Sequence, residues 1–345
     1  MTAAQWLDLL TRAHAASGHE AGVHAVLRAG LAGAFDRAET DAAGNLLLWR
    51  DGPPAAPLLL FTAHADQVAL WVSAHLPSGF LRVAAPGIDP ACLPGLCVEA
   101  GGRPGVIGML PPHLRGAEAE RAAAAPDLYV DFGPGAADDL PPVGTPIHFA
   151  TEPRRLGPDR FCAAGLDDRA SVAAIALALE ELRGERLPVR LLAAITAQEE
   201  SGRGGAAYLA TDIAVDAAIV LDVTFARQPE VADETLPLLG QGAAVGIGPN
   251  VPPALHRWIE DVAAREGLPC QREPLPGDSG TDGWRLQIAG RGVPTGLLSL
   301  PLRSMHSPQE VVSIGDVEAL GRHLAALARH PLPTAPGERG TALWS

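Results

Sequence analysis

LLLFTAHAD, at residues 58–66, is the stretch that decides the fold of this chain. Its first four residues, Leu58 to Phe61, form a continuous apolar run that stops at a polar cluster. Strands that are buried on both faces of a sheet have this pattern of residues, because neither of their faces meets water. The stretch therefore predicts a central strand of an α/β sheet, with His64 and Asp66 at its carboxyl end.

Strands and helices alternate on both sides of this stretch. Apolar runs predict further strands at 45–49, 189–197, 216–225 and 295–300. Apolar residues at helical spacing predict two helices within 5–35 and single helices at 168–183 and 252–267. The alternation predicts a three-layer α/β catalytic domain with a mixed sheet.

The pattern of apolar and polar residues changes between residues 70 and 152. Short alternating stretches such as RPGVIGMLPPH and DLYVDFGPG are separated there by proline and glycine, which predicts a small β domain. We therefore expect two domains. The catalytic domain is discontinuous, formed by residues 1–69 and 153–345, and the inserted β domain spans 70–152.

The charge composition excludes several kinds of function. The 345 residues include 40 Asp plus Glu and 26 Lys plus Arg, a formal net charge of −14, and every positive residue is arginine. Without lysine the chain has neither a phosphate-binding loop ending in G-K-[ST] nor a Schiff-base lysine. The negative charge also argues against a nucleic-acid or anionic-membrane partner, since both require a basic surface.

The cysteines and the apolar segments indicate the cellular compartment of the protein. The four cysteines have no redox or metal-finger spacing, and the first twenty residues do not resemble a secretory signal. No uncharged apolar run reaches the roughly 18 residues of a membrane span. We expect a cytoplasmic protein.

Residues able to bind a metal follow the ends of four predicted strands. They are His64 and Asp66, Glu199 and Glu200, Asp222, and His306. Ligands of open α/β sheets bind beyond the carboxyl ends of the strands, so these side chains should converge there. Asp167, in GLDDR before a predicted helix, is a candidate to bridge two ions. Imidazole and carboxylate ligands without cysteine suit Zn²⁺, Co²⁺ or Mn²⁺.

Each of these motifs also has a simpler explanation when taken alone. A His-x-Asp triplet is common by chance, and Asp167-Asp168 could serve as a helix N-cap. Glu199-Glu200 could be a solvated loop, and His306 a surface residue. The joint arrangement at four strand ends is what favours a metal centre.

In combination, several motifs resemble one known family. FTAHADQ, CAAGLDDRAS, TAQEESGRGGAA, IVLDVT and PLRSMHSPQEVVS occur in the order found in the tetrahedral (TET) or deblocking aminopeptidases. That family contains glutamyl-aminopeptidase-like dinuclear metallopeptidases, and some members carry the name endoglucanase. The resemblance extends over nearly the whole chain.

The resemblance implies a role for each candidate residue. His64 and Asp222 would bind one divalent ion and Glu200 and His306 the other, with Asp167 bridging. Asp66 would orient His64, and Glu199 would be the general base that takes a proton from the bridging water and passes it to the leaving amine. The ions would be zinc, or cobalt or manganese.

The resemblance also implies a fold, a substrate and an assembly. Members have a phosphopeptidase-type catalytic domain with a β-barrel or PDZ-like insert, and many assemble into a twelve-subunit tetrahedron. We therefore expect an aminopeptidase that takes short peptides and forms a homo-oligomer. Asp282, in GDSGTDGW, is a candidate substrate contact.

The chain departs from the family pattern at three places. Gln67 stands where the family usually has glutamate, Ala163-Ala164-Gly165 replaces a segment with lysine, and Ser304-Met305 replaces an aromatic residue. None is a proposed ligand, so the departures affect substrate contacts. Two alternatives stay open: a related aminoacylase or carboxypeptidase, and a metal-binding assembly protein without activity.

Overall fold

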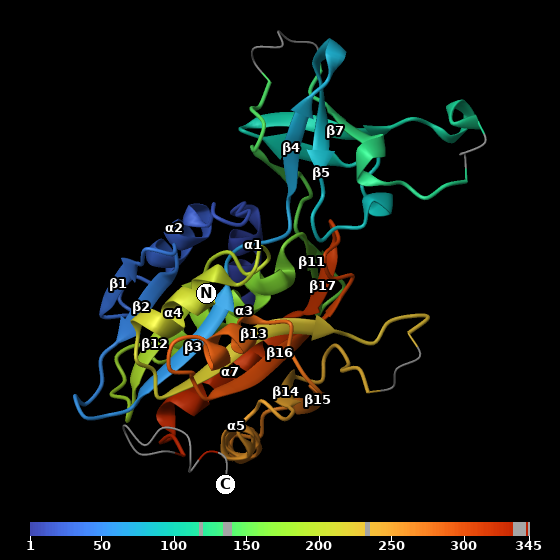
Figure 1. Ribbon diagram of the computed structural model, residues 1–345. Helices are drawn as coiled ribbons and strands as arrows, with labels where there is room; N and C mark the ends of the chain where they lie inside the picture. Colours follow the sequence, from blue (N-terminus) through green and yellow to red (C-terminus); the bar gives the residue numbers. More distant parts are fainter. Residues whose placement is uncertain (117–119, 134–139, 232–234, 334–342, 344–345) are drawn as a thin grey trace.

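The computed structural model describes residues 1–116, 120–133, 140–231, 235–333 and 343. It consists of a large α/β unit and a smaller β unit that stands to one side of it (Figure 1). The smaller unit is inserted into the larger one, because strands of the large unit both precede and follow it in the sequence.

Among the described residues, eleven strands form the mixed sheet of the large unit. Nine of them lie in the order β1 (Arg37–Thr40), β2 (Leu46–Arg50), β12 (Arg190–Thr196), β3 (Leu58–His64), β13 (Ala217–Phe225), β16 (Thr295–Arg303), β17 (Glu310–Ser313), β11 (Arg160–Ala163) and β10 (Arg154–Leu156). From β16 branch β14 (Ala243–Ile247) and then β15 (Cys270–Pro274).

The four central strands run parallel. They are β12, β3, β13 and β16, and the strands towards either edge pair antiparallel to them. All seven residues of β3 are buried, as the LLLFTAH sequence predicts. Parallel central strands carry their carboxyl ends to one edge of the sheet, which is the edge where the candidate ligands were expected.

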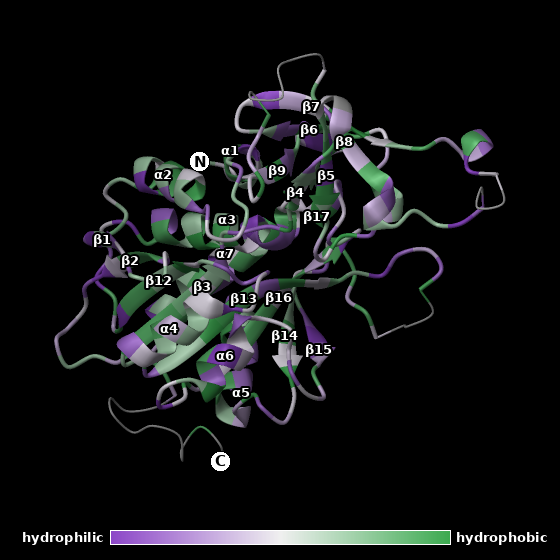
Figure 2. Cartoon of the chain, turned by 45° about the horizontal axis from the view of Figure 1, so that its top comes forward, coloured by the Kyte–Doolittle hydropathy of each residue, from purple (hydrophilic) through white to green (hydrophobic). Residues whose placement is uncertain are grey.

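Helices cover both faces of the sheet. One face carries α1 (Ala3–Arg12), α2 (Ala21–Gly30), α3 (Leu166–Glu181), α5 (Pro253–Arg265) and α7 (Ile314–Arg329). The other carries α4 (Gly204–Asp212) and α6 (Asp282–Ile288). Figure 2 shows the apolar strands enclosed between these layers. The predicted three-layer architecture is confirmed. No described helix is both long and apolar enough to cross a membrane.

The start of α3 differs from the prediction of 168–183. The helix begins at Leu166, but Asp167 (φ −77°, ψ 106°) and Asp168 (φ −114°, ψ 32°) are not helical, and the peptide bond between them is cis. Gly165 before them has φ +70°, and a Cβ there would lie 2.7 Å from Oε1 of Gln67. Glycine favours this turn, because it adopts a positive φ without strain and has no Cβ to meet the Gln67 side chain.

The smaller unit is a closed antiparallel barrel. Its strands, in order around the barrel, are β4 (Leu70–His75), β5 (Phe80–Ala84), β8 (Leu128–Asp131), β7 (Arg103–Met109), β6 (Cys97–Ala100) and β9 (Pro146–Phe149). Short 3-10 helices connect them at Pro77–Gly79, Pro90–Cys92, Pro112–Leu114 and Ala125–Asp127. Inward-facing side chains such as Leu81, Val98 and Val130 form a separate core. The predicted β-barrel insert is confirmed.

Several side-chain contacts join the barrel to the α/β unit, among them a tilted pair of rings, His19 and Trp71, with centroids 5.8 Å apart. The rings of His14 and His148 stack with centroids 4.7 Å apart and planes 9° from parallel. Arg12 Nη1 donates to Glu152 Oε2 over 2.7 Å. Burial lowers the pKa of both histidines, and that of His148 falls to about 3, to which the positive charge of His14 also contributes. The stacked rings are therefore neutral near pH 7.

Candidate metal centre and active site

The predicted ligands come from five separate segments and meet at one edge of the sheet. They are His64 at the end of β3, Asp167 at the start of α3, Glu200 after β12, Asp222 within β13, and His306 after β16. The structure thus brings together side chains that are up to 242 positions apart in the sequence, from His64 to His306. Parallel strand ends account for this convergence.

The first group of candidate ligands consists of His64, Asp167 and Asp222. Their nearest ligand atoms lie within 4.8 Å of one another, and all three residues are buried. His64 Nε2 is 3.0 Å from Asp167 Oδ1 and 3.8 Å from Asp222 Oδ1. One imidazole nitrogen and two carboxylate oxygens thus face a common point.

The second group shares Asp167 with the first. Asp167, Glu200 and His306 offer ligand atoms that also lie within 4.8 Å of one another. His306 Nε2 is 3.2 Å from Asp167 Oδ2 and 3.4 Å from Glu200 Oε2. Asp167 therefore turns one oxygen towards each histidine, which is the arrangement that a carboxylate bridging two cations requires.

The carboxylates of the two groups repel one another. Burial, together with the charge of Asp167, raises the pKa of Glu200 to about 8. Burial also raises the pKa of Asp222 well above its ordinary value. For Asp167, hydrogen bonds with His306 and His64 outweigh burial and lower the pKa to about 2. A cluster of this kind is costly to bury unless cations neutralise it.

The donor set fits divalent cations. Within the described part of the chain, Glu200 Oε1 and both carboxylate oxygens of Asp168 are buried without a hydrogen-bond partner. Buried carboxylate oxygens normally find donors or ligate metals. Two imidazoles, several carboxylates and no thiolate form the mixed nitrogen and oxygen set that zinc, cobalt and manganese accept.

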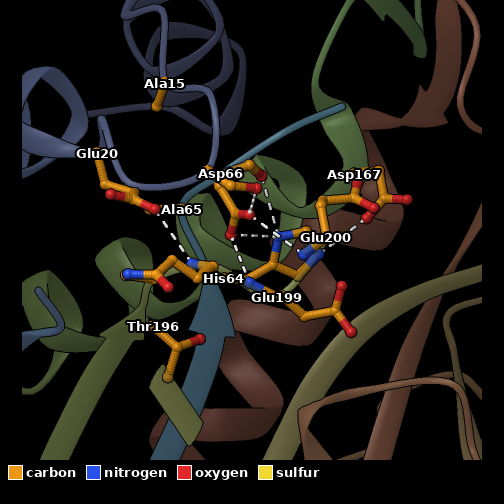
Figure 3. Close-up of polar contacts among 12 residues, drawn as sticks. Ala15, Glu20, His64, Ala65, Asp66, Asp167, Thr196, Glu199 and Glu200 are labelled. Atoms are coloured by element: carbon orange, nitrogen blue, oxygen red, sulfur yellow. Dashed lines mark hydrogen bonds and ion pairs between the residues drawn. The ribbon is translucent and has the colours of Figure 1, made fainter. Parts of the chain in front are cut away.

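Asp66 organises the loop that carries Glu199 and Glu200 (Figure 3). Its carboxylate accepts hydrogen bonds from the backbone N–H groups of Glu199 (3.0 Å) and Glu200 (3.2 Å), and from Ser17 Oγ (2.6 Å). His64 Nδ1 lies 3.0 Å from the Asp66 carbonyl oxygen and 3.6 Å from its carboxylate. The backbone carbonyl is therefore the closer orienting group for His64.

Glu310 supports the opposite side of the site, and the sequence reasoning missed it. Its Oε2 accepts from the backbone N–H of Asp167 (3.0 Å), and its Oε1 accepts from that of His306 (2.9 Å). Glu310 is buried, and burial raises its pKa to about 8. One side chain thus fixes the backbone of two candidate ligands. Its place four residues after His306, in SMHSPQE, was the available signal.

Glu199 lies on the same loop as Glu200 but has a different partner. Arg203 Nε donates to Glu199 Oε1 over 2.8 Å, and Arg203 Nη1 lies 3.5 Å from Asp278 Oδ2. Glu199 belongs to neither group of metal-binding candidates. Its carboxylate faces the cavity from beside the ligands, where a proton acceptor is needed.

Two other residues singled out from the sequence lie behind the site. Asp282 is only 2 % exposed, and its Oδ2 accepts from Thr196 Oγ1 over 2.5 Å. Burial and the charge of Glu199 raise its pKa to about 7. Gln67 is also buried, beside Gly165 and Arg169. The structure therefore places neither side chain on the cavity wall.

Backbone strain is concentrated around the site. Gln198 (φ 60°), Arg203 (φ 61°), Ser304 (φ 58°) and His306 (φ 58°) adopt the left-handed conformation that residues other than glycine rarely use. All four lie in the loops that follow β12 and β16. Strain of this kind persists where the surrounding contacts fix a functional geometry.

The site opens into a cavity of about 570 Å³. Both candidate ligand groups and Glu199 line it. Its wall also includes residues of β13, β15 and β16 and of the loops that follow them, among them Thr224, Glu273, Leu275 and Leu297. Met305, at one of the family departures, also lines it. The volume suits the first residues of a peptide.

Comparison with known proteins identifies the family. The model of the M42 glutamyl aminopeptidase family matches residues 44–322. The chain belongs to the M42 family. A lysyl aminopeptidase from Pyrococcus furiosus is 35 % identical to this M42 chain over 295 residues, which are 82 % of this chain and 84 % of that protein. The predicted resemblance is therefore confirmed.

Solved structures agree with the assignment to M42. An aminopeptidase from the archaeon Desulfurococcus kamchatkensis matches with a TM-score of 0.87 and 30 % identity, covering 95 % of this chain and 94 % of that one. A TET peptidase from Pyrococcus horikoshii, which can assemble into a tetrahedron or a large octahedral shell, matches with a TM-score of 0.84 and 27 % identity, covering 95 % and 99 %. This M42 chain is an aminopeptidase, a metal-dependent hydrolase of peptide bonds.

Proposed function

We propose that the chain removes amino-terminal residues from short peptides with a dinuclear metal centre. His64 and Asp222 would hold one divalent cation, Glu200 and His306 the other, and Asp167 would bridge them. The observation that carries this proposal is that the two carboxylate oxygens of Asp167 face different histidines. Oδ1 lies 3.0 Å from His64 Nε2, and Oδ2 lies 3.2 Å from His306 Nε2. Zinc is the cation we expect, with cobalt and manganese as alternatives.

The protein side chains divide the remaining work between them. Bound cations would supply Lewis-acid activation of a water molecule and of the substrate carbonyl. Glu199 accepts the proton of that water as general base and later donates it to the leaving amine. Arg203 holds one oxygen of Glu199, which leaves the other to handle the proton. Asp66 fixes the backbone that carries Glu199, so the base stays aligned with the cavity.

Exopeptidase action also needs a place for the free α-amine of the substrate. The carboxylates of Glu199 and Glu200 lie at the same end of the cavity and offer acceptors for an ammonium group. A peptide whose amine is acylated would lose this contact. We therefore expect cleavage of free-amine peptides in preference to blocked ones.

The test is Glu199→Gln, assayed with aminoacyl anilides and zinc, cobalt or manganese added separately. Loss of the base should lower kcat by about 10²- to 10⁴-fold. Metal content, measured by mass spectrometry, should stay at two ions per chain. Near wild-type turnover of this variant with both ions bound would contradict the assignment of the base.

A panel of peptides with free, acylated and carboxyl-terminal reporter groups separates this proposal from its rivals. Cleavage of acylated amino acids alone would indicate an aminoacylase, and release of carboxyl-terminal residues would indicate a carboxypeptidase. Metal binding with no turnover of any of these compounds would indicate a silent assembly protein. Each outcome would contradict the proposal.

We propose further that residues 70–152 form a domain for oligomerisation and access, with 1–69 and 153–345 as the catalytic domain. Support comes from the tetrahedral assembly of the Pyrococcus horikoshii relative and from apolar side chains exposed on the barrel unit, at Val106, Leu110, Leu114 and Val143. We expect a homo-oligomer, with a tetrahedral dodecamer as its form. Light scattering with metal present should give a mass near twelve times that of the 35.7 kDa chain, and a monomer would contradict this.

A cytoplasmic location is also part of the proposal. All four cysteines, Cys92, Cys97, Cys162 and Cys270, are free thiols. Free thiols persist in reducing compartments, whereas secreted proteins tend to pair them. Fractionation of cells that produce the protein is the direct measurement.

A further inference from the structure

The wall of the cavity holds a second polar group, next to Asp222 in the sheet. Asp222 on β13 and Ser299 on β16 are register partners, so their side chains face the same side of the sheet, as does Thr224 two residues beyond Asp222. Glu273 on β15 completes this wall, and Figure 1 shows β13, β16, β14 and β15 as neighbours.

Among the described residues, one hydroxyl group holds the carboxylate of Glu273. Thr224 Oγ1 donates a hydrogen bond to Glu273 Oε1. Oε2 is buried and has no hydrogen-bond partner among the described residues. Within the part of the chain that the structure describes, no arginine or histidine pairs with Glu273, so no described side chain neutralises a negative charge on it.

The nearby arginines do not supply this missing cation. Arg203 is engaged by Glu199 and Asp278. Arg285 lines the cavity from α6, but it is exposed to solvent, and its charge does not contribute to the pKa of Glu273. A buried carboxylate without a cation costs free energy, which a positively charged ligand would recover.

Two apolar side chains share the cavity wall with Glu273. Leu275 and Leu297 line the cavity beside the carboxylate. A cavity wall that combines apolar side chains with a carboxylate suits a ligand side chain with an aliphatic stem and a cationic tip. A glutamate side chain would meet repulsion there, and a leucine side chain would leave the carboxylate without a partner.

On the basis of the proposed aminopeptidase function, we propose that Glu273 selects peptides whose first residue is lysine or arginine. The α-amine and scissile carbonyl lie at the metal end of the cavity, and the first side chain extends along Leu275 and Leu297 to Glu273. Glu273 acts as a specificity-determining residue and takes no part in the bond cleavage itself.

The experiment compares lysyl, norleucyl and glutamyl anilides, since norleucine keeps the stem of lysine and lacks its charge. Wild-type kcat/KM for lysine should exceed that for norleucine by at least about tenfold, the scale of one charge pair in a partly exposed site. Glu273→Gln should remove this preference through a higher KM for lysine, with norleucine little changed. Glu266→Gln, an exposed carboxylate on the outer surface, is the matched control and should behave as wild type.

A second measurement needs no variant, and it keeps the proposal testable if Glu273→Gln does not fold. Free lysine should inhibit wild-type cleavage of norleucyl anilide more strongly than free norleucine does. Equal rates for lysine and norleucine, or an equal loss of both in Glu273→Gln, would overturn the selectivity alone. No cleavage of any anilide with any of the three cations would overturn the aminopeptidase proposal and this inference with it.

Discussion

Arg203 Nε donates a hydrogen bond of 2.8 Å to Oε1 of Glu199, and the backbone of Arg203 is left-handed. Replacing Arg203 by methionine frees the carboxylate to rotate. We expect kcat to fall about 10- to 100-fold with a smaller change in KM, because misplacing a catalytic group has effects of this size.

Arg203→Lys should recover part of the lost activity, since lysine keeps the charge without the planar geometry. Arg265→Met is the control, because Arg265 is exposed on the outer surface of α5. Steady-state kinetics on one anilide suffices. An Arg203→Met enzyme with wild-type kcat would show that Glu199 needs no orienting partner.

The Asp167→Asn and Asp222→Asn variants should differ in how many metal ions each chain retains. Asp222→Asn removes a ligand of one proposed ion only, so about one ion per chain should survive dialysis. Asp167→Asn removes a ligand of both, and we expect weakened binding at both positions. Elemental analysis after dialysis measures the stoichiometry. If Asp167→Asn kept two ions at wild-type affinity, the bridging assignment would be wrong.

Glu310 should control metal affinity without touching the metal. In Glu310→Gln an amide NH₂ would face one of the backbone N–H groups, of Asp167 or of His306, that the carboxylate accepts from. Removing such supporting contacts typically costs 10- to 100-fold in metal affinity. Titration of the metal-free enzyme with zinc measures this, with Glu266→Gln as control. Unchanged affinity would reduce Glu310 to a structural role.

The His14–His148 stack should make stability depend on pH. Burial lowers the pKa of His148 from 6.5 to about 3. Below pH 6.5 the unfolded chain therefore binds a proton that the folded chain does not, and this contribution to stability is lost as the pH falls from 6.5 towards 3. Its largest slope is about 1.4 kcal/mol per pH unit.

His148→Gln should flatten this dependence by up to that slope, measured by urea unfolding between pH 4 and pH 7. His113→Gln, at an exposed position on the same barrel, should leave it unchanged. Identical pH profiles for His148→Gln and wild type would mean that His148 takes up its proton as readily in the folded chain as in the unfolded one.

The sequence was sufficient to predict the layers of the fold and the convergence of the candidate ligands. Both follow from where apolar runs stop: LLLFTAH ends at His64, and the run over 189–197 ends just before Glu199. Parallel strands then place these residues at one edge. The barrel was predictable for a related reason, because short alternating stretches separated by proline and glycine have few other stable arrangements.

Other features of the site depend on contacts that a pattern of residue types does not encode. Glu310 acts on two backbone N–H groups, and any buried acceptor at a suitable distance could do so. Arg203, which pairs with Glu199, has a left-handed backbone although it is not glycine. Burial of Asp282 also could not be read from GDSGTDGW, since a glycine-rich turn is as often exposed as enclosed.

The strand order has a consequence for synthesis on the ribosome. Both neighbours of β3 in the sheet, β12 and β13, are translated more than a hundred residues after it, with the whole barrel in between. The nascent chain thus carries an apolar strand with two unpaired edges while the barrel already has all its strands. Such edges are prone to pair with other chains. Early capture by chaperones, and aggregation of fragments that end within residues 70–189, are the expected results.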